Sequence, residues 1–192
     1  MTKLIIGLIV FLGVHSVRII ADAWRARRIA RLGEMTWKGI YSVIAILGFV
    51  LIVWGYGEAR ATPIVLWDPP AWTRHVASLL VLFSFILIAA AYIPHTRIKV
   101  AIGHPMVAGV KLWAFAHLLA NGTLADVMLF GGFLAWAIAN FIAARRRDRA
   151  AGTVYIKGPV MRDVTAILAG IVGWWVFAFY LHAWWIGVRP FG

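Results

Sequence analysis

Six apolar segments divide the 192-residue chain, and their lengths restrict the fold more than any other feature. They are the ranges Leu4–Ala21, Ile40–Gly57, Val76–Ile93, Pro105–Asn121, Thr123–Ala144 and Val164–Gly187. A helix crosses a bilayer with about 20 mostly apolar residues. Hydrophobic residues make up 63% of the chain and charged residues 14%, whereas soluble domains are about half apolar and about a quarter charged. The sequence predicts an all-α fold, a polytopic integral membrane bundle of about six transmembrane helices in one domain, residues 1–192.

Two of the segments need a further argument. Pro105–Asn121 contains Lys111 and His117, which are costly in hydrocarbon unless they face protein. We still expect a helix there, because omitting it would disrupt the alternation of the loops between the two sides. Leu4–Ala21 follows Lys3 as a signal peptide would, but no small-residue cleavage site precedes a soluble sequence. We therefore expect an uncleaved first helix.

The excess of basic residues is explained by topology. The chain has 19 Lys and Arg against 7 Asp and Glu, and 15 of these cations lie in or near the loops after the first, third and fifth segments. The others are Lys3, Arg60, Arg74 and Arg189. The positive-inside rule places the three basic loops in the cytoplasm and both termini on the outer side. Nucleic acid is therefore not an expected partner; membrane lipid is, since the run Arg145–Arg149 could hold anionic headgroups.

Several kinds of chemistry are excluded by what the sequence lacks. The chain has no Cys, so it forms no disulfide, thiolate zinc site, thiolate-ligated haem or cysteine-held iron–sulfur cluster. It contains no phosphate-binding loop, no His-Glu-x-x-His zinc motif and no Gly-x-Ser-x-Gly nucleophile elbow. Carboxylates are scattered, and Asp126 alone lies in or near a predicted span. Any chemistry must therefore depend on histidine, on hydroxyl groups or on a bound cofactor.

Histidine is the most prominent of these candidates, with six in the chain. His15 and His117 lie inside apolar segments, and His182 lies near the outer end of the last one. Polar residues within a span are expensive and often functional. The other three, which lie at segment ends where an imidazole is easily solvated, are His75, His95 and His104.

The depth of the buried histidines leaves alternatives open. At 1.5 Å per residue, His15 lies roughly 16 Å from the outer end of its segment and His117 roughly 18 Å from the inner end of its own. The two imidazoles could each form an interhelical hydrogen bond, with Ser16 or a Trp as partner. Alternatively, they could face each other as the axial ligands of a b-type haem. The pair His117 and His182 competes with them, and depth alone slightly favours that pair.

The block Thr96–Gly122, TRIKVAIGHPMVAGVKLWAFAHLLANG, resembles the NnrU family of bacterial membrane proteins, named for a role in denitrification and nitric oxide metabolism. It also resembles the related 15-cis-zeta-carotene isomerase of plants and cyanobacteria. The resemblance extends through HSVRI, LGEMTWKGIYS and FYLHAWW. It implies a bacterial inner membrane location, in which the outer side assigned by charge to both termini is the periplasm, and a haem b cofactor in the isomerase branch. At the matching positions, the resemblance implies that His15 and His117 are the metal ligands. It gives Trp113, His104 and His182 as further cofactor-binding candidates.

Two functional classes follow from this resemblance. The first is a haem-dependent isomerase acting on a polyene or another lipid-soluble small molecule. The second is a non-catalytic haem protein that senses nitric oxide or supports the machinery of nitrite and nitric oxide reduction. Ala114 stands where the isomerase has a Cys, which weakens the transfer of isomerase activity. A third interpretation is a helical scaffold without haem, and the sequence identifies neither catalytic residues nor a substrate.

Overall fold

The computed structural model describes residues 1–191, and its regular structure is helical. The elements are α1 (Thr2–Ile20), α2 (Asp22–Leu32), α3 (Glu34–Ala61), α4 (Trp72–Tyr92), α5 (Arg97–Ile102), α6 (Pro105–Ala120), α7 (Leu124–Ala150), α8 (Val160–Val176), the π-helix η1 (Phe177–Leu181) and α9 (His182–Ile186). Helices α1, α3, α4, α7 and the continuous α8–η1–α9 are long and apolar enough to cross a membrane. Helix α6 is shorter, with 16 residues. The predicted all-α membrane bundle and its six apolar helices are confirmed.

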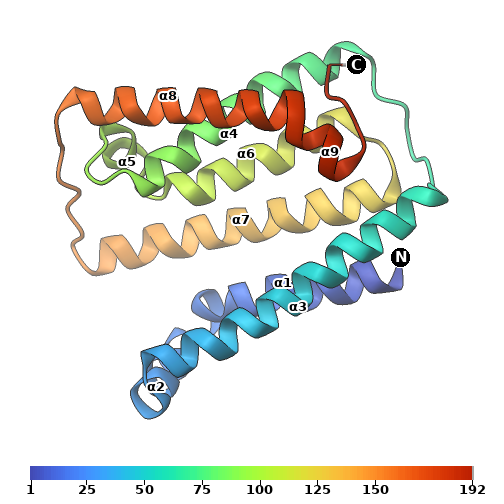
Figure 1. Ribbon diagram of the computed structural model, residues 1–192. Coiled ribbons are helices and arrows are strands. Elements are labelled where there is room, and N and C mark those ends of the chain that lie inside the picture. The colour runs from blue at the N-terminus through green and yellow to red at the C-terminus, as the bar shows by residue number, and fades with distance from the viewer. Residues whose placement is uncertain (192) are drawn as a thin grey trace.

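The helices form two groups on either side of α7 (Figure 1). Helices α1 and α3 pack along each other, and we call them the N-terminal hairpin. Helix α4 packs against both α6 and α8, and we call these three helices the C-terminal bundle. Helix α7 contacts α6 on one side and the N-terminal hairpin on the other. The two groups are therefore joined mainly through α7.

The two ends of the molecule differ in charge. One end, here called the basic end, carries α2, α5 and the segment 151–159 (Figure 1). The opposite end, here called the terminal end, carries the N-terminus, the segment 62–71 and the segment 187–191. Helix α7 runs six residues beyond its predicted span, so the run Arg145–Arg149 is helical. The short helices α2 and α5 lie where the sequence predicted loops.

Glycine brings the backbones of the N-terminal hairpin into contact. A Cβ atom on Gly7 would lie 2.6 Å from the Ile52 nitrogen, and one on Gly48 would lie 2.7 Å from the Phe11 nitrogen. Gly55 lies equally tightly against the backbone of Leu4. Small residues allow such close approach of helices in membranes. The stretch of the hairpin from Leu4 to Phe11 therefore leaves no space for a ligand between its helices.

The C-terminal bundle is tight at one end and open at the other. Toward the basic end, a Cβ atom on Gly170 would lie 2.5 Å from the Ile86 Cα, and the Ser84 hydroxyl donates to the Gly109 carbonyl at 2.8 Å. One turn nearer the terminal end, α6 carries Trp113 and α8 carries Trp174. Bulky side chains there hold the helices apart, which creates a cavity.

Candidate functional site

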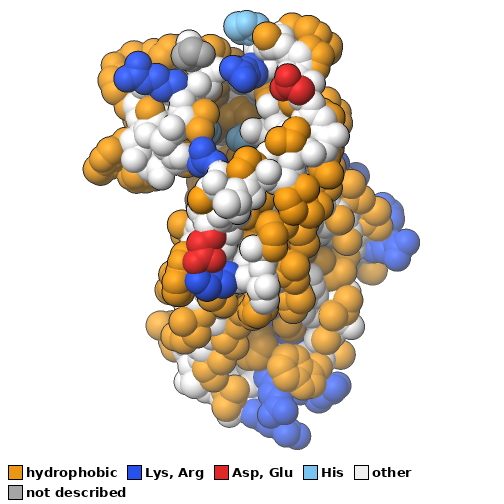
Figure 2. Space-filling model, turned by 90° about the vertical axis from the view of Figure 1, so that its right-hand side faces the viewer, with side chains coloured by type: hydrophobic (Ala, Val, Ile, Leu, Met, Phe, Trp, Pro, Cys, Tyr) orange, Lys and Arg blue, Asp and Glu red, His pale blue; other side chains and the backbone are white. Residues whose placement is uncertain are grey.

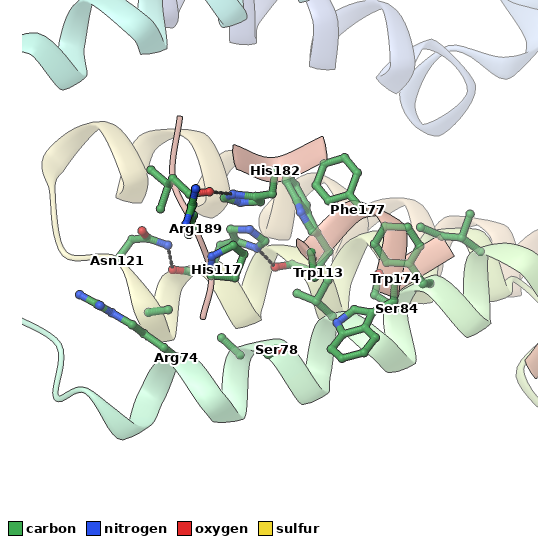
Figure 3. Close-up of a pocket in the computed structure, with 18 of the residues that line it drawn as sticks. Arg74, Ser78, Ser84, Trp113, His117, Asn121, Trp174, Phe177, His182 and Arg189 are labelled. Carbon is green, nitrogen blue, oxygen red and sulfur yellow. Dashed lines mark hydrogen bonds between the residues drawn. The ribbon is translucent and has the colours of Figure 1, made fainter. Parts of the chain in front are cut away.

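The cavity has a volume of about 440 Å³ and lies between α4, α6 and the η1–α9 region at the terminal end (Figure 3). Its walls include the aromatic side chains Phe85, Trp113, Trp174 and Phe177. Ligand cavities for small molecules are typically about 300–1,000 Å³ and mostly apolar. The size and lining of this cavity therefore suit one organic ligand of cofactor size.

His117 lines the cavity from α6, and its ring orientation is fixed by two contacts. The ring stacks on Phe130 of α7 at a centroid distance of 4.6 Å. Its Nδ1 lies 2.9 Å from the Trp113 carbonyl oxygen, one helical turn back. Because a carbonyl only accepts, Nδ1 carries the proton and donates. In the neutral ring, Nε2 is then left with a lone pair.

His182 lines the same cavity from the other side. It follows the π-helix η1. Such π-helical turns are rare in proteins as a whole, but those that occur are often at functional sites. The His182 Nδ1 donates to the Val188 carbonyl oxygen at 2.7 Å. Figure 3 shows His117 and His182 lying next to each other, each with this backbone hydrogen bond. The cavity therefore contains two imidazoles whose Nε2 atoms are both available as ligands.

His15 lies outside this cavity. Its ring packs among Phe11, Tyr41 and Trp136, at centroid distances of 4.2, 5.2 and 6.0 Å. Its helix α1 and the helix of His117 lie on different sides of α7, and within residues 1–191 these two helices have no backbone contact. The structure thus brings together His117 and His182, the competing pair, rather than His15 and His117.

The interhelical hydrogen bonds considered as one alternative for the two histidines are absent from residues 1–191. The His15 Nδ1 donates to the Phe11 carbonyl oxygen at 2.6 Å, within its own helix, as His117 does. Ser16 also donates to its own helix, at 2.6 Å to the Leu12 carbonyl oxygen. The structure therefore does not show that alternative, because each of these side chains bonds to the carbonyl four residues back in its own helix.

The other predicted site residues divide between the two ends of the molecule. Trp113 lines the cavity beside His117. His104 lies at the basic end, where its Nε2 is 2.8 Å from the Asp148 carboxylate, and it does not line the cavity. The Tyr155 hydroxyl donates to the same carboxylate at 2.7 Å. Partial burial and this bond raise the pKa of Tyr155 to about 12, so the hydroxyl remains a donor at neutral pH.

A buried carboxylate next to the cavity was not recognised as structural from the sequence. Asp126 is 5% exposed and accepts hydrogen bonds from the Tyr56 hydroxyl at 2.5 Å and from the Thr123 hydroxyl at 2.6 Å. Thr123 and Asp126 form a capping box at the start of α7. The Thr-x-x-Asp spacing before an apolar run was the available signal. Asp126 connects the N-terminal hairpin to the helix that supports His117.

The polar rim of the cavity is positively charged. Arg74 and Arg189 line it, and no Asp or Glu does. Within residues 1–191, neither arginine forms a salt bridge. Figure 2 shows basic side chains around a hollow in which a His side chain is visible. The cavity can therefore accept a ligand that combines an apolar body with negatively charged groups.

A bare metal ion is a poor fit to this site. Among the described residues, no group of three or more His, Asp or Glu side chains could hold a metal ion. Two imidazoles can nevertheless complete the coordination of an iron whose other four ligands come from a macrocycle. The donor set in the cavity therefore fits haem better than a free cation.

Comparison with known proteins gives the family. The model of the family described as NnrU protein matches residues 3–190, nearly the whole chain. No curated protein matches the chain, and no solved structure matches it. A match of this extent shows that the chain belongs to the NnrU family.

Proposed function

We propose that this membrane protein binds haem b in the cavity, with His117 and His182 as the axial ligands. The observation that carries the proposal is the shared environment of the two imidazoles. Both line one aromatic cavity, and both hold Nδ1 on a backbone carbonyl while Nε2 stays available. Such carbonyl bonds to the second ring nitrogen are typical of metal-ligating histidines, because they fix the tautomer and the ring orientation.

The remaining lining residues support the same ligand. Apolar walls suit a porphyrin, and Trp113 and Trp174 provide broad apolar faces. Arg74 and Arg189 could pair with the two propionates, since arginine binds carboxylates with paired hydrogen bonds. When bound, haem supplies a redox-active iron whose potential and ligand exchange are set by its axial ligands.

The structure favours a role with a small ligand such as nitric oxide. A cavity of about 440 Å³ that is partly open leaves little space for a long polyene beside a bound cofactor. Ala114, at the position of the isomerase cysteine, is fully buried and does not line the cavity. We therefore favour a non-catalytic haem protein that senses nitric oxide or supports denitrification over an isomerase of a lipid-soluble substrate.

The test is the absorbance spectrum of the purified protein, reduced minus oxidised, from cells with ample haem supply. We expect a low-spin bis-imidazole spectrum whose haem is extracted by acid acetone, because no thioether motif is present. The His117→Ala variant should lose that spectrum. A wild-type protein without a Soret band would contradict the proposal. Two further measurements separate the functional classes. Nitric oxide titration of the ferrous protein tests the sensor, and pigment profiling in cells that make poly-cis carotenes tests the isomerase.

We also propose that the protein lies in a bacterial inner membrane with both termini in the periplasm. The basic end then faces the cytoplasm, in agreement with the positive-inside rule. A reporter fused after Arg149 should behave as cytoplasmic, and one fused after Asp68, in the segment 62–71, should behave as periplasmic. The opposite pattern would reverse the orientation without changing the fold.

A further inference from the structure

A second cavity lies at the basic end, far from the histidine pair. Its volume is about 250 Å³, and it lies between the turn that follows α4, the helix α5 and the segment 154–156. His95, Lys99 and Tyr155 supply its polar groups. Helix α4 ends at Tyr92, directly before this turn. If the apolar helices occupy the hydrocarbon, the cavity lies at the level of the phospholipid headgroups.

The charge of this second cavity is unbalanced. Lys99 lines it and, within residues 1–191, has no carboxylate partner. Both nearby carboxylates are already engaged. Asp148 accepts from His104 and Tyr155. Asp163 accepts from the Ile98 N–H at 3.1 Å through one oxygen, and its other oxygen, which has no hydrogen bond in the described chain, pairs with Arg97 at 4.0 Å. The cavity therefore presents a lysine without a counter-charge, which favours an anionic ligand.

The turn before α5 is held in place by the residues that lead into α8 and begin it. Gly158 N–H donates to the His95 carbonyl at 2.9 Å, and the Arg162 guanidinium donates to the Pro94 carbonyl at 3.0 Å. His95 has a φ of 59°, in the left-handed region that non-glycine residues adopt only rarely. These bonds fix the turn that forms one wall of the cavity.

Apolar side chains border the cavity on its open side. Val154 is 84% exposed and Ile156 is 68% exposed, and both line it. Tyr155, between them, is held by its hydrogen bond to Asp148. An exposed Val and Ile beside an unpaired Lys give a surface that is apolar and cationic at once. A phospholipid presents the complementary combination of acyl chains and a phosphate.

We propose that this second cavity binds an anionic phospholipid, with its phosphate at Lys99 and His95 and its acyl chains against Val154 and Ile156. Basic pockets between transmembrane helices bind anionic headgroups in this way. The site does not depend on haem, because it lies at the opposite end of the C-terminal bundle. Its ligand makes contacts with α5 and the segment 154–156 together, so it would hold the two in place.

The test measures lipid retention by native mass spectrometry of the full chain, with phosphatidylglycerol or phosphatidylcholine added in detergent. We expect the wild type to retain phosphatidylglycerol in preference to phosphatidylcholine. Lys99→Gln should weaken that retention by about tenfold, and Ile156→Ser should weaken it by a smaller factor. Lys38→Gln is the matched control, because Lys38 also lies toward the basic end but pairs with Glu34 at 2.7 Å. It should bind lipid as the wild type does.

Three results would overturn the proposal. The first is equal retention of phosphatidylglycerol by the wild type and the folded Lys99→Gln variant, with folding checked by circular dichroism. The second is equal retention of the two lipids by the wild type. The third is displacement of the lipid by inorganic phosphate at comparable concentration, which would assign the cavity to free phosphate. The haem spectrum should be the same in all four proteins, so this test and that of the proposed function are separate.

Discussion

The N-terminal hairpin and the C-terminal bundle are built from equally apolar helices, yet the cavity lined by two histidines lies in the bundle. In the hairpin, Gly7, Gly48 and Gly55 bring the two backbones into contact along the stretch from Leu4 to Phe11. In the bundle, Gly109 and Gly170 bring the helices together at one end only. Toward the terminal end, bulky aromatic residues take the place of the small ones.

This difference shows that the position of the small residues decides where a membrane bundle can bind a ligand. His15, on the hairpin, contacts three aromatic rings and lines neither of the two cavities described above. His117 and His182, beyond the glycines of the bundle, line a cavity. All three histidines have the same Nδ1 bond to a carbonyl. Local hydrogen bonding is therefore not what separates them; packing is.

The strongest test of this contrast exchanges the histidines for alanine. We expect His182→Ala to lower the haem content of the purified protein at least about tenfold, since losing even an outer partner of a metal ligand costs about 10–100-fold in affinity. His15→Ala should leave the haem content and the spectrum unchanged. The measurement is the haem-to-protein ratio by pyridine haemochrome. Loss of haem in His15→Ala, with retention in His182→Ala, would move the ligand to the hairpin.

A second test concerns the glycines that close the hairpin. Gly55→Ala places a methyl group against the Leu4 backbone, which cannot move aside as a side chain can. We expect a loss of about 3 kcal/mol in the free energy of unfolding, the upper part of the usual range for overpacking. Gly57→Ala is the matched control on the same helix, because nothing lies within 4 Å of its Cβ position. Equal stability of the two variants in detergent unfolding would refute the close approach.

A smaller effect should come from the bond that connects the hairpin to α7. Tyr56→Phe removes the hydroxyl that donates to the buried Asp126 carboxylate, and we expect a loss of about 1.5 kcal/mol in the free energy of unfolding, the lower end of the range for hydrogen bonds to charged groups. Tyr92→Phe is the control, because Tyr92 is 74% exposed. Thermal unfolding in the same detergent measures both. If the two variants are equally stable, Asp126 does not join the two regions.

Most of the fold follows from the sequence, because helices in a bilayer are dictated by apolar length. The segment Pro105–Asn121 was predicted in spite of Lys111, and the structure has α6 there with the Lys111 ammonium 4.4 Å from the centre of the Phe141 ring. Helices α2 and α5 were missed because the prediction followed apolar length, which short polar helices lack. The Asp22 in the first turn of α2 and the Thr96 side chain that caps α5 were the local signals.

The site was predicted in part. The sequence identified His117, Trp113 and His182 as cofactor-binding candidates, and all three line the cavity. It could not identify the partner of His117, because two helices of similar depth remain equivalent until their packing is known. The sequence motif around His104 also gave no indication that this histidine would lie at the basic end. There it bonds to the carboxylate of Asp148, which is 44 residues later in the chain.

The π-helix η1 has a consequence for how this family can vary. A π-helical turn contains more residues than an α-helical turn, so η1 acts as a one-residue insertion in an otherwise regular helix. The wider turn absorbs this residue locally, so the residues after η1 keep nearly the rotation that a regular α-helix one residue shorter would give them. A change that made Phe177–Leu181 α-helical at unchanged length would instead rotate everything that follows by about 100° and turn His182 away from the cavity. A relative that is one residue shorter here and α-helical throughout would therefore keep its histidine in the cavity.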